Sequence, residues 1–197
     1  MVAEIKHASY FESIGLPLDE LFAAELDDAG WGGSDAPLII ESFELGVLGK
    51  LAARDVGGKK VFLIEATGTP EDQRLAHGNA ARSYADFVTE AGLYALGGLV
   101  DGISVNRSMI VQQDVAGIPE TSDLVDLAHA AMLEVYTWTL RPENRFLLPA
   151  HRGGRGQAQH GDWWSEFELI MSTGIDGVFA DHPDLAVAVR DGLRGEA

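Results

Sequence analysis

The stretch Val2-Ala3-Glu4-Ile5-Lys6-His7 begins almost at the first residue and has the pattern of a short β-strand. It is partly apolar and leads into a loop that carries Pro17, which suits a strand better than a helix. Because side chains alternate between the faces of a strand, Glu4 and Lys6 are expected on one face and Ile5 on the other. Two interpretations follow: an exposed ion pair of little consequence, or a metal-binding carboxylate beside a cation that meets an anionic substrate.

The rest of the chain repeats the order of a strand followed by a helix, six times in all. The predicted strands cover residues 2–7, 37–42, 60–64, 101–105, 135–139 and 176–180. The predicted helices cover residues 18–26, 43–54, 84–96, 122–133, 163–171 and 185–193, while 67–81 and 108–120 are predicted to be irregular. This alternation is typical of a parallel α/β sheet. It is compatible with an open doubly wound sheet or with a (β/α)8 barrel, although a full barrel has eight units and about 250 residues.

Composition excludes several functional classes. The chain has 197 residues, 46% of them hydrophobic, and carries a formal net charge of -17. Such an acidic chain repels nucleic-acid backbones, so no nucleic-acid partner is expected, and a phosphate substrate would need local positive charge or a metal. The absence of cysteine excludes disulfides and thiolate chemistry. No apolar run approaches the length of a membrane span, and Lys6 and His7 interrupt any signal-peptide core.

The carboxyl ends of the predicted strands collect polar residues, and this is where parallel α/β folds place their sites. The mixture of carboxylates, cations and an aromatic residue suits metal-assisted hydrolysis of a phosphate ester better than redox chemistry. No glycine-rich dinucleotide or P-loop motif follows a strand. For Trp138, packing at the strand end and stacking on a substrate are both open. The residues in question are Glu4 and Lys6, Ser42 and Phe43, Glu65, Asn106 to Ser108, Trp138 to Arg141, and Asp181 to Asp184.

Two segments near the end of the chain resemble the end of the glycerophosphodiester phosphodiesterase family, most closely its larger bacterial periplasmic or secreted type. They are Val135-Tyr136-Thr137-Trp138-Thr139-Leu140-Arg141-Pro142-Glu143-Asn144 and Gly174-Ile175-Asp176-Gly177-Val178-Phe179-Ala180-Asp181-His182-Pro183-Asp184. Glu4-Ile5-Lys6-His7 is similar to the Glu-x-Lys motif of that family's third strand. Glu41-Ser42-Phe43-Glu44 is similar to its fourth strand, and Gly98-Leu99-Val100-Asp101-Gly102-Ile103-Ser104 to its sixth.

The resemblance implies an incomplete (β/α)8 TIM barrel with units three to eight present, forming one partial domain over residues 1–197. It implies that Glu4 is a carboxylate ligand of a divalent cation, Ca²⁺ or Mg²⁺, and that Lys6 is a catalytic residue beside the phosphate. Trp138 and Phe43 would bind the substrate, a small glycerophosphodiester that the whole enzyme would cleave to glycerol 3-phosphate and an alcohol. The implied location is periplasmic or secreted.

The family's two acid–base histidines and two further metal carboxylates have no counterpart here, because the resemblance places them ahead of Glu4. The chain by itself is therefore expected to be inactive. One alternative is a non-catalytic barrel fragment that binds a phosphorylated ligand or a partner chain, and another is a different barrel enzyme. His151-Arg152-Gly153-Gly154 looks like the family's opening motif, but its place in the loop 141–161 favours a flexible insertion. An incomplete barrel also has open edges, which predicts self-association.

Overall fold

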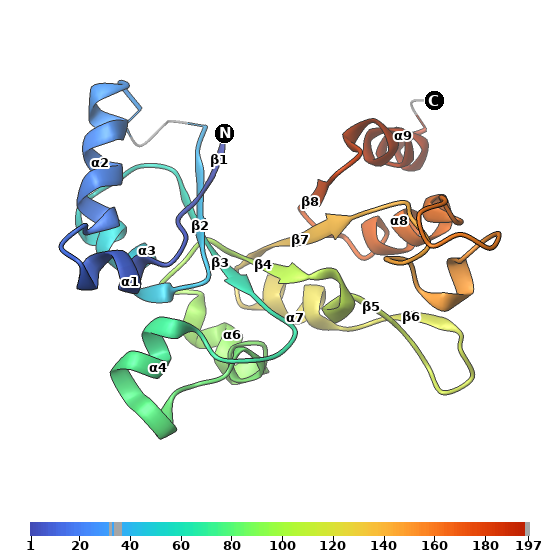
Figure 1. Ribbon diagram of the computed structural model, residues 1–197, viewed down its shortest axis with the longest axis horizontal. Coiled ribbons are helices and arrows are strands. Elements are labelled where there is room, and N and C mark those ends of the chain that lie inside the picture. The colour runs from blue at the N-terminus through green and yellow to red at the C-terminus, as the bar shows by residue number, and fades with distance from the viewer. Residues whose placement is uncertain (32, 34–36, 196–197) are drawn as a thin grey trace. The chain divides into compact units, whose positions relative to one another are not determined.

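The computed structural model of the chain describes residues 1–31, 33 and 37–195 (Figure 1). Six strands form one sheet in the order β1-β2-β3-β4-β7-β8, which follows the order of the chain, and β5 and β6 form a separate two-stranded sheet. Residues Met1–Ser104 and Ala128–Glu134 form a first compact unit, whereas Val105–Leu127 and the residues from Val135 onward form a second. The predicted α/β alternation of six strands is confirmed.

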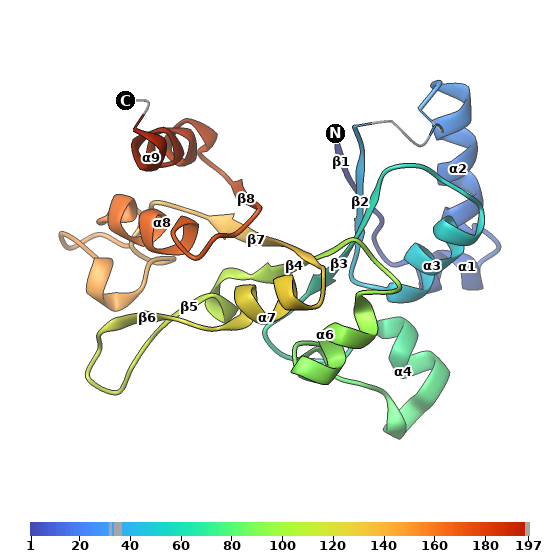
Figure 2. The same ribbon diagram turned by 180° about the vertical axis from the view of Figure 1, so that it is seen from behind.

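The first compact unit holds the N-terminal strands, which pair in parallel, and the helices that cover them. Helices α1 to α3 lie together beside β1 and β2 in both views of the chain (Figures 1 and 2). The elements up to the start of the second unit are β1 (Val2–Glu4), α1 (Ala8–Ser13), α2 (Leu18–Asp28), β2 (Ile39–Ser42), α3 (Leu45–Ala53), β3 (Lys59–Ile64), α4 (Glu71–His77), α5 (Tyr84–Phe87), α6 (Glu90–Leu96) and β4 (Gly102–Asn106).

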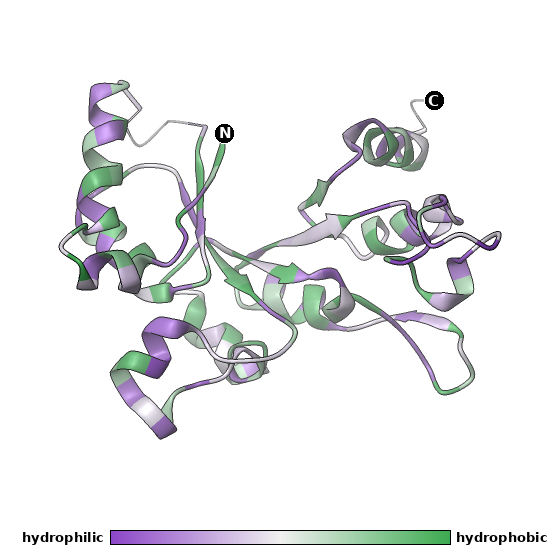
Figure 3. Cartoon of the chain, in the orientation of Figure 1, coloured by the Kyte–Doolittle hydropathy of each residue, from purple (hydrophilic) through white to green (hydrophobic). Residues whose placement is uncertain are grey.

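The core of the first unit forms because β3 is apolar on both faces over its last four residues, as strands buried inside a parallel sheet are, and because the first half of β2 is apolar as well. Ile40 and Phe62 are fully buried, and Leu48 and Leu51 of α3 pack into the same core. Helix α4 has no buried residue. The hydropathy colouring makes the contrast visible, with β3 largely apolar and α4 largely hydrophilic (Figure 3).

The first strand is shorter than predicted. The ladder pairs Glu4 with Glu41, and one further bond, from the Ile5 N–H to the Glu41 carbonyl at 2.8 Å, extends the pairing past the strand. His7 then adopts a left-handed conformation with φ 54°, and α1 begins at the next residue. The prediction of a strand through residue 7 is therefore wrong in its second half, because the chain turns into a helix where a loop was expected.

The second compact unit contains α8, whose buried residues Phe167 and Ile170 pack in its interior, and a parallel pair formed by β7 and β8. A short antiparallel hairpin of β5 and β6 occupies part of the segment predicted to be irregular. The remaining elements are β5 (Val111–Gln113), β6 (Pro119–Thr121), α7 (Leu124–Ala130), β7 (Glu134–Leu140), α8 (Trp163–Met171), β8 (Gly177–Ala180) and α9 (Pro183–Arg194), of which α7 and β7 span the boundary between the units.

The segment 141–161, predicted to be a flexible insertion, has a hydrogen-bonded structure of its own. Asn144 is buried, its Oδ1 accepts from the Gly153 N–H at 2.9 Å, and its Nδ2 donates to the Gly156 carbonyl at 2.8 Å. The ring of His151 is tied down as well, because its Nδ1 lies 3.0 Å from the Glu166 Oε2. In the residues that the structure describes, no helix has the length and apolar character needed to cross a membrane.

Candidate functional site

A cavity of about 710 Å³ opens at the carboxyl ends of β1, β2 and β3, within the first compact unit. The residues that line it come from the turn after β1, from α1 and from the segments that follow β2 and β3. This is the edge of a parallel sheet at which sites are expected. The lining residues are Glu4, Ile5, Lys6, His7, Tyr10, Phe43, Glu44, Glu65, Thr69, Glu71 and Tyr84.

Glu4 and Lys6 meet in this cavity as the sequence predicted. The Lys6 Nζ lies 3.1 Å from the Glu4 Oε2, and the side chains are 66% and 25% exposed, respectively. An ion pair this exposed contributes little to stability, since water screens both charges. The Lys6 ammonium is accessible to a molecule in the cavity.

Glu41 is a second carboxylate of the same sheet face. Because Glu4 and Glu41 are register partners in a parallel ladder, their side chains point to the same side of the sheet. Glu41 is only 7% exposed, and its Oε2 is buried without a hydrogen-bond partner among the described residues. Burial raises the pKa of the Glu41 carboxyl to about 7; the charge of Glu4 adds to the increase and Lys6 opposes it. A carboxylate is thus held in an environment that disfavours its charge.

Aromatic rings form another part of the lining. Phe43 follows β2, and its ring packs edge-on against Tyr84 with 6.4 Å between the centroids. Burial and the nearby carboxylates, first among them Glu65, raise the pKa of Tyr84 to about 12, so the phenol stays neutral. Glu44 accepts a hydrogen bond from the Ser9 N–H at 2.9 Å, which ties α1 to the segment after β2. Phe43 is therefore placed on the cavity, and Glu44 has a structural role there.

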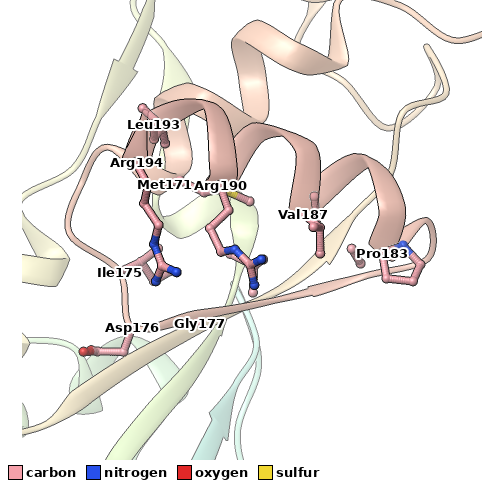
Figure 4. A pocket seen from close by; sticks show the side chains of 12 residues that line it. Met171, Ile175, Asp176, Gly177, Pro183, Val187, Arg190, Leu193 and Arg194 are labelled. Carbon is pink, nitrogen blue, oxygen red and sulfur yellow. The ribbon is translucent and has the colours of Figure 1, made fainter. Parts of the chain in front are cut away.

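Trp138 lies on β7, in the second compact unit, where it is half-buried. The pairing of β7 with β8 is irregular between Thr137 and Leu140, so Trp138 lies in a distorted part of the strand. The second unit has its own cavity of about 540 Å³ beneath α9, with apolar side chains such as Val187 in its lining. Arg190 and Arg194 project into it from α9 towards β8 (Figure 4).

The cavity at β1 is rich in oxygen donors and poor in positive charge. It is lined by Glu4, Glu44, Glu65 and Glu71, and among its described lining residues Lys6 is the one lysine or arginine side chain. Carboxylate oxygens are the ligands that Ca²⁺ and Mg²⁺ prefer. Within the described ranges, however, no three His, Asp or Glu residues are grouped closely enough to hold a metal ion by themselves.

Sequence reasoning found Glu4, Lys6, Phe43 and Glu65 at this edge but missed Glu41 as a part of the site. The sequence did contain an indication, because Glu41 directly follows the apolar run Leu38-Ile39-Ile40. Burying a charge in a strand is costly, so a charged residue at this place indicates a particular role. The neighbour of Glu41 could not be known without the register that sets it opposite Glu4.

Comparison with known proteins identifies the family of the chain. Residues 4–185 match the Glycerophosphoryl diester phosphodiesterase family. Among curated proteins, the chain is 26% identical over 174 residues to Glycerophosphodiester phosphodiesterase GDPD6 of Arabidopsis thaliana, a match that covers 85% of this chain and 43% of that protein. The chain thus spans less than half the length of this relative.

Two solved structures share the fold. A glycerophosphoryl diester phosphodiesterase from Silicibacter pomeroyi matches 90% of this chain with a TM-score of 0.57 and 16% identity, over 45% of its own length. A glycerophosphodiester phosphodiesterase from Parabacteroides distasonis matches 98% of this chain with a TM-score of 0.54 and 9% identity, over 58% of its own length. The α/β fold, the pair at the end of β1 and the match over residues 4–185 lead to one conclusion: this chain belongs to the glycerophosphoryl diester phosphodiesterase family.

Proposed function

We propose that this chain forms part of the active site of an enzyme that hydrolyses glycerophosphodiesters to glycerol 3-phosphate and an alcohol. The observation that carries the proposal is the Glu4–Lys6 pair in a cavity of about 710 Å³ at the carboxyl ends of three parallel strands. In the proposed arrangement the chain supplies units three to eight of a (β/α)8 barrel of the larger bacterial type.

Each predicted site residue has a distinct role in this proposal. The Lys6 ammonium binds a non-bridging oxygen of the phosphate and stabilises the negative charge that develops there during hydrolysis. Phe43 packs against the glycerol or alcohol part of the substrate from the wall of the cavity. Trp138, on β7 of the second compact unit, is kept as a substrate-binding residue on the strength of the family resemblance alone. The exposure of Lys6 supports its role, because an exposed ammonium can exchange Glu4 for a phosphate oxygen.

A divalent cation, Ca²⁺ or Mg²⁺, is part of the proposal. The site fits it, because Glu4 supplies a carboxylate oxygen and the four carboxylates of the lining would otherwise repel a phosphodiester anion. Glu4 is the proposed ligand, and the remaining positions would go to water and substrate oxygens. Such a cation polarises the phosphoryl oxygens and helps to activate the attacking hydroxyl or water.

The purified chain by itself is expected to hydrolyse glycerophosphocholine poorly or not at all. The reason is chemical: the likeness to the family's opening histidine motif, His151-Arg152-Gly153-Gly154, lies in the loop 141–161 rather than after a first strand. Without the two further carboxylates that the resemblance implies, a divalent cation is also held weakly. Release of glycerol 3-phosphate in the presence of Ca²⁺ or Mg²⁺ measures this. Turnover near that of an ordinary family member would contradict the assignment and would direct attention to His151 and His182.

The same proposal makes self-association the expected behaviour of the isolated chain. Strands β1 and β8 end the strand order, and each exposes apolar side chains: Val2 is 43% exposed, and Val178 and Phe179 are only half-buried. Strands inside a parallel sheet are normally covered on both faces, so these edges are available to a second copy. Size-exclusion chromatography with light scattering should show dimers or larger species. A monodisperse monomer with a sharp melting transition would contradict this expectation.

The periplasmic or secreted location that the resemblance implies remains part of the proposal. Fractionation of cells that produce the native gene product, followed by immunodetection of this chain, tests it. Recovery in the cytoplasmic fraction would argue against it.

A further inference from the structure

Glu41 lies in a strand whose other residues are apolar or hydrogen-bonded, and its side chain is the exception. The neighbouring Ser42 Oγ donates to the Ile5 carbonyl at 2.8 Å, and Ile40 is part of the core. The Glu41 Oε2, in contrast, is buried without a partner in the part of the chain that the structure describes. A buried oxygen of a carboxylate that lacks a donor is costly, so its retention calls for an explanation.

The surroundings of Glu41 make the absence of a donor more costly. The ladder sets Glu41 directly opposite Glu4, and the two carboxylates share one face of the sheet. Like charges at this spacing repel each other, and the one cation beside them, Lys6, is engaged with the Glu4 Oε2 at 3.1 Å. Two adjacent carboxylates with an unpaired oxygen are what a divalent cation neutralises, since it bonds to both and removes their repulsion.

We propose that Glu41 is the second carboxylate ligand of the divalent cation held by Glu4, so that β1 and β2 each supply one ligand. This inference rests on the proposed function and adds to it a residue that the Glu-x-Lys motif does not contain. Two carboxylates provide up to four oxygens, and Ca²⁺ takes six to eight, which leaves coordination positions for water and for phosphate oxygens. Lys6, whose side chain is 66% exposed in the lining of the cavity, stays available to the phosphate.

Glu41 is not one of the residues that line the cavity, and its geometry differs from that of the acidic residues that do. Glu44 accepts from the Ser9 N–H, and Glu71 accepts from the Arg74 Nε at 2.8 Å, so both have partners. Glu65 follows the end of β3 and is half-buried at the rim. Glu65 therefore serves as a control: its replacement removes the same unit of charge from the cavity without touching the Glu4–Glu41 pair.

The test uses the full 197-residue chain and the cations themselves. Isothermal titration with Ca²⁺ and with Mg²⁺ is carried out on the wild type and on Glu41→Gln, Glu4→Gln and Glu65→Gln. We expect Glu41→Gln and Glu4→Gln each to weaken binding about 10- to 100-fold, as loss of a ligand charge does. The double variant should bind at least as weakly as either single variant, and its loss should differ from the sum of the two single losses, because the two residues act on one ion. Glu65→Gln should bind like the wild type.

Thermal melts with chelator or cation distinguish a lost ligand from a lost fold. Without cation, Glu41→Gln should melt above the wild type, because the variant no longer buries an unpaired charge. Added cation should raise the melting temperature of the wild type and of Glu65→Gln but leave that of Glu41→Gln nearly unchanged.

Three results would overturn the proposal: wild-type affinity in Glu41→Gln, equal weakening in Glu65→Gln, or no cation binding by the wild-type chain. These results are independent of hydrolysis. A further outcome is that the cation titrations come out as expected while an enzyme completed with the N-terminal portion of a family member does not cleave glycerophosphodiesters. In that case the proposed function is wrong and the cation site stands.

Discussion

Replacing Glu166 with alanine is expected to destabilise the second compact unit by about 3–5 kcal/mol, the cost of leaving a buried charge without its partner. Glu166 is 1% exposed on α8 and joins three separate segments. Its Oε1 accepts from the Arg107 Nη1 at 2.7 Å, and its Oε2 accepts from the Leu148 N–H at 2.7 Å and lies 3.0 Å from the His151 Nδ1.

The size of the effect follows from what the substitution leaves behind. Burial lowers the pKa of Arg107 and the charge of Glu166 opposes that change, so this carboxylate is the anion that offsets the buried guanidinium charge. Alanine at position 166 would leave the Arg107 guanidinium without its carboxylate and the Leu148 N–H without its acceptor. It would also open a cavity in the packed face of α8. The stability of Glu166→Gln should lie between that of the wild type and that of Glu166→Ala, since the amide oxygen still accepts one hydrogen bond.

Urea unfolding monitored by circular dichroism gives the free-energy change directly. Glu168→Ala is the matched control: it lies on the same helix, is exposed, and should change stability by at most about 0.5 kcal/mol. A loss of less than about 1 kcal/mol in Glu166→Ala would show that the segments around it are held by other contacts.

The strands were the part of the fold that could best be predicted from the sequence, because a buried parallel strand is a continuous run of apolar residues. The predicted strand at 60–64 corresponds to β3, and the predicted strand at 135–139 corresponds to β7, each within a residue or two of the observed ends. The helices that pack on them, such as α3 and α8, were recognisable because a helix on a sheet repeats its apolar residues with helical spacing.

The elements that were missed lack such a pattern. Helix α4 buries none of its residues and is fixed instead by a distant contact, in which the Asp72 Oδ2 accepts from the Gly46 N–H at 2.7 Å. The hairpin of β5 and β6 depends on a turn in which the Asp114 Oδ1 accepts from the Ile118 N–H at 2.8 Å and Gly117 adopts φ 81°. Two three-residue strands carry too little periodicity to be predicted from the sequence alone.

The residues of the candidate site likewise differ in whether a local sequence pattern was enough to predict them. Alternation along the predicted strand placed Glu4 and Lys6 on one face; β1 ends at Glu4, but the two side chains do meet, at 3.1 Å. Glu41 was not recognised, because its significance depends on a register between strands that are about 35 residues apart in sequence, and a shift of one residue would turn its side chain to the other face. A local sequence pattern predicts which face of a strand a side chain occupies. The residue that lies beside it on the neighbouring strand can be identified only from the tertiary structure.

The role of Lys6 carries the second large expected effect. In an enzyme completed with the N-terminal portion of a family member, Lys6→Met should lower the kcat for glycerophosphocholine about 10²- to 10³-fold, the usual cost of losing a preorganised charge at the reacting group. Methionine keeps much of the length and apolar stem of lysine, so the loss reports the ammonium. Its effect on cation affinity should be small, whereas Glu4→Gln should raise the cation concentration that half-maximal activity requires, because the amide keeps the shape and removes the charge.

The most direct test of the account is therefore the rate of glycerol 3-phosphate release by this completed enzyme, measured at limiting and at saturating Ca²⁺ or Mg²⁺, for the wild type, Lys6→Met and Glu4→Gln. We predict cation-dependent release by the wild type, a large loss in Lys6→Met at every cation concentration, and a loss in Glu4→Gln that saturating cation partly restores. Full activity of both variants at limiting cation would contradict the account and would reduce Glu4 and Lys6 to an exposed ion pair.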